Sequence, residues 1–366
     1  FFERGFTLLR QGGALVFISS NKYFRAGYGE KLRGYLAREG RVKTLIDFGD
    51  APVFTAIAYP SIIVVTKQTP DGIRNVGARH AVPLITRVLN WEPGPPIEEF
   101  PRVYAEHSFE MEQAELKPDG WRLESKTVLR LLDKIRRAGT PLGDYVKGRF
   151  YRGVLTGLNE AFVVDRETRD RLIAEHPSSE EVLKPFLRGR DVKRWRVEFA
   201  DLWLIFTRRG IDINKYPAIK KHLTQFKQEL MPGAPGGRKP GSYEWYEIQD
   251  NIAYWREFEQ PKIIYPDIYE HQSFVCDATG FFLANTCYFI PTSEFWLCGL
   301  LNSNVVEWFY SSISNRIRGG YLRSFSDYMQ QIPIPPNTYA AQIENLVDCC
   351  IQPVGARHAV PLRDQR

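Results

Sequence analysis

The sequence predicts a mixed α/β chain in two parts, the end of a doubly wound α/β domain followed by an α+β domain. Three observations lead to this prediction. Helical and strand-like apolar patterns alternate over residues 1–66, as they do in doubly wound sheets. A stretch rich in proline, glycine and charge follows at 67–120, which is typical of loops and short strands at a boundary. From about residue 143 the apolar runs become short and irregular.

The first domain is expected to start with a helix. Phe2, Phe6 and Leu9 fall on one helical face, and Gly12-Gly13 is a usual helix stop. Because the sequence opens with Phe1 rather than Met, already inside this helical pattern, we expect it to be part of a larger protein.

Three strands are expected after this helix. Residues 14–18 form a continuous apolar run, which is typical of a buried parallel strand. An amphipathic helix that ends at Gly40 precedes further strands over 42–48 and 59–66. The polar turn Ser19–Lys22 follows the first strand, at the carboxyl end where open α/β sheets bind ligands.

The rest of the chain contains two clear helical patterns. One begins after Ser125, a good N-cap residue, and stops before Gly139, and the other spans Leu297–Tyr310. The proline-rich run 331–336 is expected to be extended. We therefore expect four segments: the end of the first domain at 1–110, a helical linker at 111–142, the α+β domain at 143–340 and a C-terminal tail at 341–366.

Composition permits a polyanionic partner without requiring one, since the formal net charge is +6 and the isoelectric point about 8.9. The five cysteines are odd in number and form no Cys-x-x-Cys pair, which argues against a metal site or disulfide framework and favours a reducing cytoplasm. No apolar stretch has the length of a membrane helix, so we expect no membrane partner. An identical nonamer occurs at Val76–Leu84 and Val354–Leu362, and nothing in the sequence explains it.

Several short stretches carry a family resemblance. Near the start they are Leu8–Gly13, Leu15–Lys22, Ile46–Phe54 and Ile62–Val65. These resemble the second half of an adenine-specific DNA methyltransferase domain. Further along they are Gly153–Asn159, Leu183–Val192, Lys262–Ile268, Leu300–Ser303 and Gln331–Pro335. These resemble the TaqI-like target-recognition domain of type IIG restriction–modification enzymes and related phage-defence methyltransferases.

The resemblance implies the C-terminal part of a Rossmann-like methyltransferase domain followed by an α+β target-recognition domain. The intact enzyme would be a site-specific DNA methyltransferase that uses S-adenosylmethionine to methylate the exocyclic amine of a flipped adenine in double-stranded DNA. The sequence contains neither a glycine-rich S-adenosylmethionine loop nor an Asn-Pro-Pro-Tyr motif. We therefore expect an N-terminally truncated methyltransferase that holds no catalytic residue and is inactive alone.

Two alternatives stay open. The chain could be a non-catalytic DNA-binding specificity module that works with a separate subunit. It could also be part of a bifunctional type IIG restriction endonuclease–methyltransferase with a nuclease domain or subunit. A methyltransferase motif encoded upstream would argue against the first alternative, and an upstream nuclease motif would support the second.

By resemblance, Phe54 is placed where an aromatic ring stacks on the flipped base, which needs a flat apolar wall once it leaves the duplex. The alternative is an ordinary core phenylalanine at the entrance of a strand. Ser20, Asn21 and Lys22 would line the same pocket, or they form a simple polar turn.

The candidate DNA-binding residues fall into three groups along the second part of the chain. Basic side chains hold phosphates, and arginine also reads guanine bidentately. We expect Arg188, Arg190, Arg316, Arg318 and Arg323 on one face, although a solvated charged surface is the alternative. The turn residues could contact the DNA backbone or only shape their loop. The three groups are Lys184, Arg188, Arg190, Lys193 and Arg194; Arg316, Arg318 and Arg323; and the turn residues Thr156 and Asn159.

Overall fold

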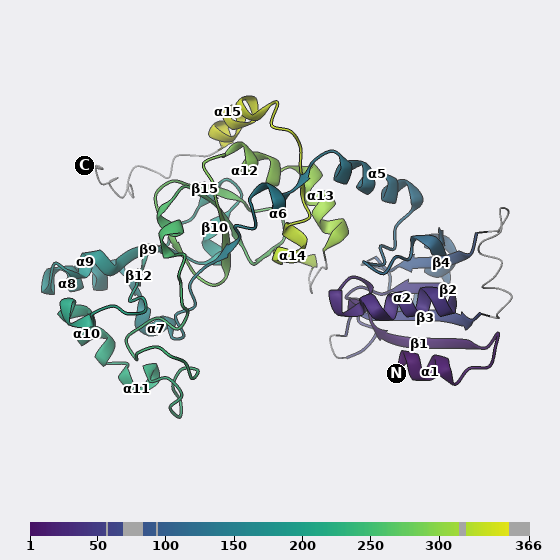
Figure 1. The fold of residues 1–366 in the computed structure, drawn as a ribbon, viewed down its shortest axis with the longest axis horizontal. Coiled ribbons are helices and arrows are strands. Elements are labelled where there is room, and N and C mark those ends of the chain that lie inside the picture. Colours follow the sequence, from purple (N-terminus) through teal and green to yellow (C-terminus); the bar gives the residue numbers. More distant parts are fainter. Residues whose placement is uncertain (56–57, 69–82, 93, 315–319, 351–366) are drawn as a thin grey trace. The chain divides into compact units, whose positions relative to one another are not determined.

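The computed structural model describes residues 1–55, 58–68, 83–92, 94–314 and 320–350 (Figure 1). These residues form two compact units. Unit 1 holds Phe1–Gly139 together with Phe309–Leu322, and unit 2 holds Thr140–Trp308 together with the chain from Arg323. Both units mix helices with strands, so the predicted α/β class is confirmed. The short segment Phe309–Leu322, which lies inside the expected α+β domain, contributes to unit 1.

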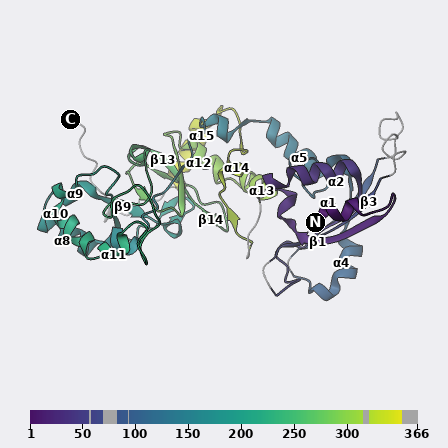
Figure 2. The ribbon, with the colours of Figure 1, turned by 60° about the horizontal axis from the view of Figure 1, so that its bottom comes forward.

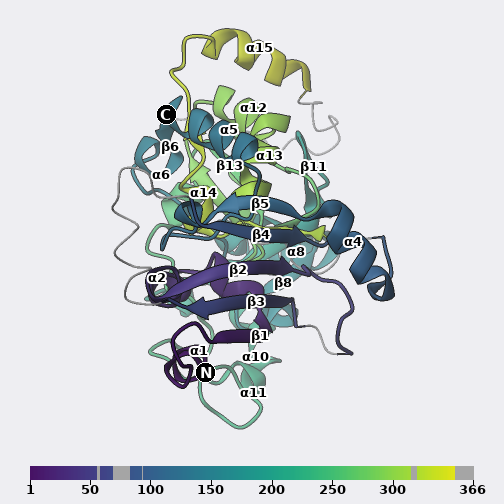
Figure 3. The same cartoon turned by 90° about the vertical axis from the view of Figure 1, so that its right-hand side faces the viewer.

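Unit 1 is built on a five-stranded sheet with the strand order β1-β3-β2-β4-β5 (Figure 3). Strand β3 runs antiparallel to both of its neighbours, whereas β2 and β4 are parallel. The first three strands along the chain lie close to the positions that the apolar pattern predicts, whereas the last two fall in the stretch for which only loops and short strands were predicted. Their bounds are β1 Ala14–Ser20, β2 Gly40–Asp47, β3 Pro60–Lys67, β4 Ile85–Asn90 and β5 Phe109–Glu112.

The prediction of a strand at 14–18 was right, but the prediction that this strand is buried and parallel was wrong. In the described residues β1 pairs with β3 alone, and it does so in antiparallel orientation. Val16 is 65% exposed and Ile18 is 45% exposed, because every second side chain of this edge strand points away from the core. A run of apolar residues indicates a strand, but it does not show whether that strand has one neighbour or two in the sheet.

Helices cover both faces of this sheet. Leu36 of α2 (Glu30–Glu39) packs in one core cluster with Leu45, and Val103 of α4 (Phe100–His107) packs in another with Ile46. Since consecutive residues of a strand point to opposite faces, α2 and α4 lie on opposite sides of the sheet (Figures 2 and 3). Helix α4 falls in the 67–120 stretch, where only loops and short strands were predicted.

Two further helices of unit 1, α1 and α5, lie where helices were predicted, although α1 ends before the predicted stop at Gly12-Gly13. Helix α1 spans Phe2–Thr7, and the backbone turns at Gly12 with φ of 74°, a value that favours glycine. Helix α5 spans Lys126–Arg137, and the Ser125 hydroxyl accepts a hydrogen bond from the Val128 amide over 3.4 Å, as its N-cap role requires.

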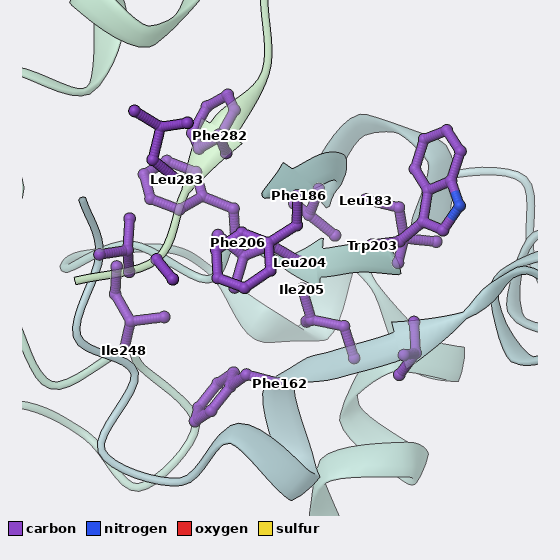
Figure 4. Close-up of a cluster of buried hydrophobic side chains, with 14 of the residues drawn as sticks. Phe162, Leu183, Phe186, Trp203, Leu204, Ile205, Phe206, Ile248, Phe282 and Leu283 are labelled. Atoms are coloured by element: carbon purple, nitrogen blue, oxygen red, sulfur yellow. The ribbon is translucent and has the colours of Figure 1, made fainter. Parts of the chain in front are cut away.

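Unit 2 has a large aromatic and aliphatic core to which residues of two small sheets contribute, and Figure 4 shows part of it. Phe162, Phe186 and Phe282 are each at most 2% exposed within it. The first sheet has the order β16-β9-β12-β8 and the second β15-β13-β17-β7. Their strands are β7 Tyr151–Arg152, β8 Val163–Asp165, β9 Leu183–Leu187, β12 Leu202–Ile205, β13 Lys262–Pro266, β15 Val275–Asp277, β16 Phe282–Leu283 and β17 Cys287–Pro291.

Short elements complete unit 2. The two-stranded pairs are β10 with β11, β14 with β18, and β6 with β19. Helices α8 to α11 gather beside β9 and β12 in both Figure 1 and Figure 2. The pairs comprise β6 Thr140–Pro141, β10 Val192–Lys193, β11 Arg196–Val197, β14 Ile268–Tyr269, β18 Leu322–Arg323 and β19 Pro333–Ile334. The helices are α6 Leu142–Tyr145, α7 Asn159–Phe162, α8 Arg166–Glu175, α9 Ser179–Val182, α10 Pro217–Thr224, α11 Lys227–Leu230 and α14 Ser326–Met329.

The helix predicted over Leu297–Tyr310 is two helices, α12 (Trp296–Leu301) and α13 (Asn304–Ile313). They separate at Asn302, which is fully buried. Its Oδ1 accepts from the Phe274 amide over 3.0 Å and its Nδ2 donates to the Phe274 carbonyl over 2.8 Å. The asparagine thus bonds the backbone of the residue just before β15, and the helical apolar pattern is interrupted there.

The expected C-terminal tail begins with a helix, α15 (Ala340–Cys350). It packs closely on α12, because a Cβ added at Gly299 would lie 2.6 Å from a methyl of Val347 and 2.8 Å from one of Ile343. Residues 351–366 lie outside the described residues, as do most of the first nonamer copy and all of the second. The predicted extended run contains β19, as expected.

Candidate nucleic-acid interface

Polar side chains gather in unit 1 where β1 and β2 end and β3 begins, because the antiparallel register brings these strand ends to one edge. Asn21 Nδ2 donates to Asp47 Oδ1 over 2.7 Å, and the Gly49 amide donates to the same oxygen over 2.9 Å. Asp47 therefore fixes the orientation of the Asn21 amide, one of the predicted pocket residues.

Lys22, another predicted pocket residue, lies against an aromatic ring. Its ammonium is 3.8 Å from the centre of the Tyr59 ring, a cation–π contact. Burial lowers the pKa of Lys22, Asp47 partly opposes this, and Arg25 adds to it. Tyr59 has φ of 46°, a value that few residues other than glycine adopt. Sequence reasoning missed Tyr59, although a Tyr-Pro pair at the start of a predicted strand was a usable signal.

The two remaining predicted pocket residues differ in their surroundings. The Ser20 hydroxyl accepts from the Lys22 amide over 3.4 Å and so caps a short 3₁₀ turn, which favours the polar-turn alternative for this residue. Phe54 is 49% exposed and lies outside the core clusters of unit 1. Its exposure argues against the alternative of an ordinary core residue, and its stacking role stays a prediction.

The basic cluster of unit 2 is mostly engaged within the protein. Arg188 donates through Nε and Nη2 to the two oxygens of buried Asp191, over 2.9 and 2.8 Å. Asp191 also accepts from the Arg188 backbone amide over 2.8 Å, so the pair closes the turn between them. These hydrogen bonds raise the pKa of Arg188 and hold it charged. Arg188 is therefore first a structural residue of the turn that carries Arg190.

Three further members of the cluster have partners as well. Lys184 Nζ lies 3.2 Å from Glu259, and Lys193 Nζ lies 3.9 Å from Glu198. Arg194 donates to the carbonyl of Asn302 and lies over the Trp195 ring. The Lys193 pair is exposed and long, so it contributes little to stability and leaves the ammonium available to a phosphate.

Arg190 differs from its neighbours, since it is exposed and has no hydrogen-bond or ion-pair partner within the described ranges. It lines two surface hollows of about 460 and 520 Å³ that meet at Gly189, Arg190 and Thr286. The second hollow is also lined by Asn159, a predicted DNA-contacting residue.

The two residues predicted to contact DNA from the turn before α7 lie in different surroundings. Thr156 is 1% exposed and its hydroxyl donates to Asn159 Oδ1 over 2.7 Å, which favours its loop-shaping alternative. Asn159 is exposed. Gly157 adopts φ of 86°, and a Cβ there would lie 2.6 Å from the Arg238 side chain. Only glycine fits this turn.

Arg238 holds this turn in place, and sequence reasoning missed it. It is 5% exposed and donates to carbonyls of both neighbouring loops, including those of Thr156 over 2.9 Å and Glu247 over 2.7 Å. Burial lowers the pKa of Arg238, while Tyr243 and Glu247 oppose this. A single arginine beside a proline- and glycine-rich loop is a weak signal in sequence.

The third predicted group is only partly described. Arg316 and Arg318 lie outside the described residues, so the expectation of one shared face stays a prediction. Arg323 Nη2 donates to Asp267 Oδ2 over 2.9 Å, and its guanidinium lies over the Phe325 ring.

The described part of the chain offers neither a metal site nor a membrane span. No three His, Cys, Asp or Glu side chains there come together in a way that could hold a metal ion. Among the same residues, every helix is too short or too polar to cross a membrane.

Comparison with known proteins assigns both parts of the chain. Residues 184–334 match the family of TaqI-like C-terminal specificity domains, and residues 1–54 match the Eco57I restriction-modification methylase. The type II methyltransferase M.PaeR7I of Pseudomonas aeruginosa is 26% identical over 354 residues, which is 92% of this chain and 58% of that protein. The chain is therefore similar to restriction-modification methyltransferases along most of its length.

Two further relatives show the same likeness. The type II methyltransferase M.BstVI of Geobacillus stearothermophilus is 24% identical over 371 residues, which is 95% of this chain and 63% of that protein. RM.Eco57I of Escherichia coli, a type II restriction enzyme and methyltransferase, is 20% identical over 379 residues, or 92% of this chain and 36% of that protein. The chain thus spans about three fifths of M.PaeR7I and M.BstVI, at 58% and 63%.

A solved structure supports the fold. The type IIL restriction-modification enzyme MmeI, determined in complex with DNA, aligns with a TM-score of 0.51 at 14% identity, over 92% of this chain and 41% of that chain. Together with the two family matches, this likeness confirms the predicted resemblance to methyltransferases that carry a TaqI-like domain.

Proposed function

We propose that this chain supplies DNA recognition and part of the target-base pocket to a site-specific DNA methyltransferase. The observation that carries the proposal is an exposed Arg190, without a side-chain partner among the described residues, at the meeting point of two hollows in the segment that matches the TaqI-like specificity domains. A methylase segment precedes that domain in the same chain. In the intact enzyme the methyl group of S-adenosylmethionine would pass to the exocyclic amine of an adenine.

The edge of the unit 1 sheet suits a planar base that has left the duplex. Phe54 offers an exposed ring, and Tyr59 with Lys22 offers a second aromatic surface beside a partly desolvated cation. The Asn21 amide, held by Asp47, offers hydrogen bonds to a base edge. A flipped base needs stacking and polar contacts of this kind. S-Adenosylmethionine would supply the methyl group, but no glycine-rich cofactor loop exists in this sequence, so we assign no residue of the chain to the cofactor.

The chain alone is expected to transfer no methyl group to DNA, because the sequence lacks both the cofactor loop and the Asn-Pro-Pro-Tyr motif. Incubation with labelled S-adenosylmethionine and mixed duplex DNA measures this directly. The intact methyltransferase serves as the positive control. Label incorporated by the chain above the protein-free background would contradict the expectation.

Lys193→Met is expected to weaken the binding of the full chain to every duplex by a similar factor. A cation at a phosphate releases counterions on binding, so its loss should reduce the magnitude of the slope of log K against log salt by about 1. Fluorescence anisotropy on several unrelated duplexes over a range of salt concentrations tests this.

The matched control is Lys221→Met, which also removes an exposed lysine of unit 2 with a single carboxylate partner, Glu175 at 3.3 Å. This change should leave both affinity and salt slope as they are. Equal effects of the two substitutions would mean that net charge alone governs binding. An unchanged slope in Lys193→Met would remove Lys193 from the interface.

A second candidate is part of a bifunctional restriction endonuclease–methyltransferase, and the match to RM.Eco57I favours keeping it. In that case the two activities would share this specificity domain. The coding sequence upstream of Phe1 separates the candidates. A methyltransferase motif alone supports the first, an additional nuclease motif supports the second, and the absence of both would support a non-catalytic specificity module.

A further inference from the structure

The hollow of about 460 Å³ in unit 2 is bounded by two segments of chain, 189–193 and 266–273. Thr286 ties the two segments together. Its hydroxyl accepts from the Gly189 amide over 2.9 Å, and its carbonyl accepts from the Asp267 amide over 2.8 Å. Both walls of the hollow are therefore fixed to one residue, so the distance between them is set by the fold.

The first wall presents Arg190 from a rigid turn. A Cβ at Gly189 would lie 2.7 Å from the Thr286 carbonyl oxygen, so the backbone packs there without room for a side chain. On the other side of Arg190, the Arg188–Asp191 ion pair closes the turn. The turn thus fixes the Arg190 backbone while the guanidinium stays exposed and without a partner in the described ranges.

The second wall presents Glu270 in a similar way. Its charged neighbours are both engaged, since Asp267 accepts from Arg323 over 2.9 Å and His271 Nδ1 lies 3.0 Å from Glu307. Glu270 itself is exposed and lines the hollow, and no ion pair or hydrogen bond of its side chain occurs among the described residues.

The charges of this hollow decide what it can bind. A phosphate site needs cations, whereas Glu270 and Asp267 would repel a phosphate. The edge of a base pair offers acceptors and donors side by side, which a free guanidinium and a free carboxylate can match. In the major groove, arginine pairs with guanine O6 and N7, and glutamate accepts from the cytosine amino group.

We propose that Arg190 and Glu270 read G·C base pairs of the target sequence, Arg190 by donating to guanine and Glu270 by accepting from cytosine. This assignment rests on the proposed function, namely that unit 2 recognises DNA. In this assignment Arg190 and Glu270, one on each wall of the hollow, select the sequence, whereas Lys193, on the same wall as Arg190, contacts the DNA backbone.

The experiment selects duplexes from a randomised pool with the full chain and with the variants Arg190→Ala, Arg190→Lys and Glu270→Ala. The wild-type chain should enrich a motif that contains G·C pairs. Each alanine variant should lose preference at one or two adjacent positions, by roughly 5- to 150-fold, and keep its binding to unselected DNA. Arg190→Lys should lose the preference too, because lysine keeps the charge but not the bidentate geometry.

Arg196→Ala is the matched control, since this exposed arginine pairs with Glu198 and does not line the hollow. It should enrich the wild-type motif, and thermal unfolding should show that all variants fold. An unchanged motif in Arg190→Ala and Glu270→Ala would overturn this inference alone, as would a uniform loss of affinity on every sequence. A wild-type chain that binds no DNA would overturn the proposed function itself.

Discussion

Arg238→Met is expected to destabilise unit 2 by about 3 kcal/mol or more, since it removes a charged hydrogen-bond donor from several buried or partly buried carbonyls. Arg238 donates to the carbonyls of Leu230, Thr156 and Glu247 at 2.7–3.0 Å, and to those of Trp245 and Glu244 at 2.9 and 3.4 Å. A methionine fills similar space but donates no hydrogen bond. Each buried carbonyl that is left without a donor costs about 1–3 kcal/mol, unless a water molecule replaces the lost hydrogen bond.

The effect should also reach the DNA-binding surface. Without Arg238 the turn at Thr156–Asn159 loses one of its anchors, and Asn159 lines the hollow that contains Arg190. Urea unfolding of unit 2, followed by tryptophan fluorescence, measures the stability change. Lys239→Met is the matched control, because Lys239 is the exposed neighbour in sequence. Similar unfolding midpoints for the two variants would show that the loops fold without the buried guanidinium.

Local patterns in the sequence predicted much of unit 1. Apolar spacing located the helices α1, α2 and α5 and the strands β1, β2 and β3, and Ser125 marked a helix start. The pattern could not give the edge position of β1, because sheet neighbours are set by contacts far apart in the chain. It also missed α4, because this helix is short and its few apolar residues lie among proline and charged residues.

The candidate site was harder to predict because charge spacing says nothing about partners. Arg188 and Arg190 look equivalent in sequence, yet one closes a turn with Asp191 and the other is exposed. Glu270 and Tyr59 went unnoticed, since the segments that face them are distant in sequence. Asn302, in a helical pattern, serves the backbone of Phe274 instead. Tertiary contacts decide each of these cases.

Phe54→Ala in the intact methyltransferase is expected to reduce methylation roughly 5- to 150-fold while the protein stays folded. A base that leaves the duplex loses its stacking partners, and an aromatic wall returns about 1–3 kcal/mol. Because the Phe54 side chain is 49% exposed, its removal opens no core cavity and should change the melting temperature little. Phe54→Tyr should retain most of the activity, since it keeps the ring.

The stacking role of Phe54 predicts a second result, which a purely structural role does not predict. If Phe54 compensates the cost of flipping, the loss in Phe54→Ala should shrink on duplexes whose target adenine is mispaired, because that base is already partly released. Tyr28→Ala removes another exposed aromatic of the same unit, 75% exposed, and should leave methylation unchanged on both substrates. Methylation rates on matched and mispaired duplexes, read beside thermal unfolding, separate the two roles. A loss that is equal on both duplexes, or that follows a fall in melting temperature, would show that the ring supports the fold and does not hold the base.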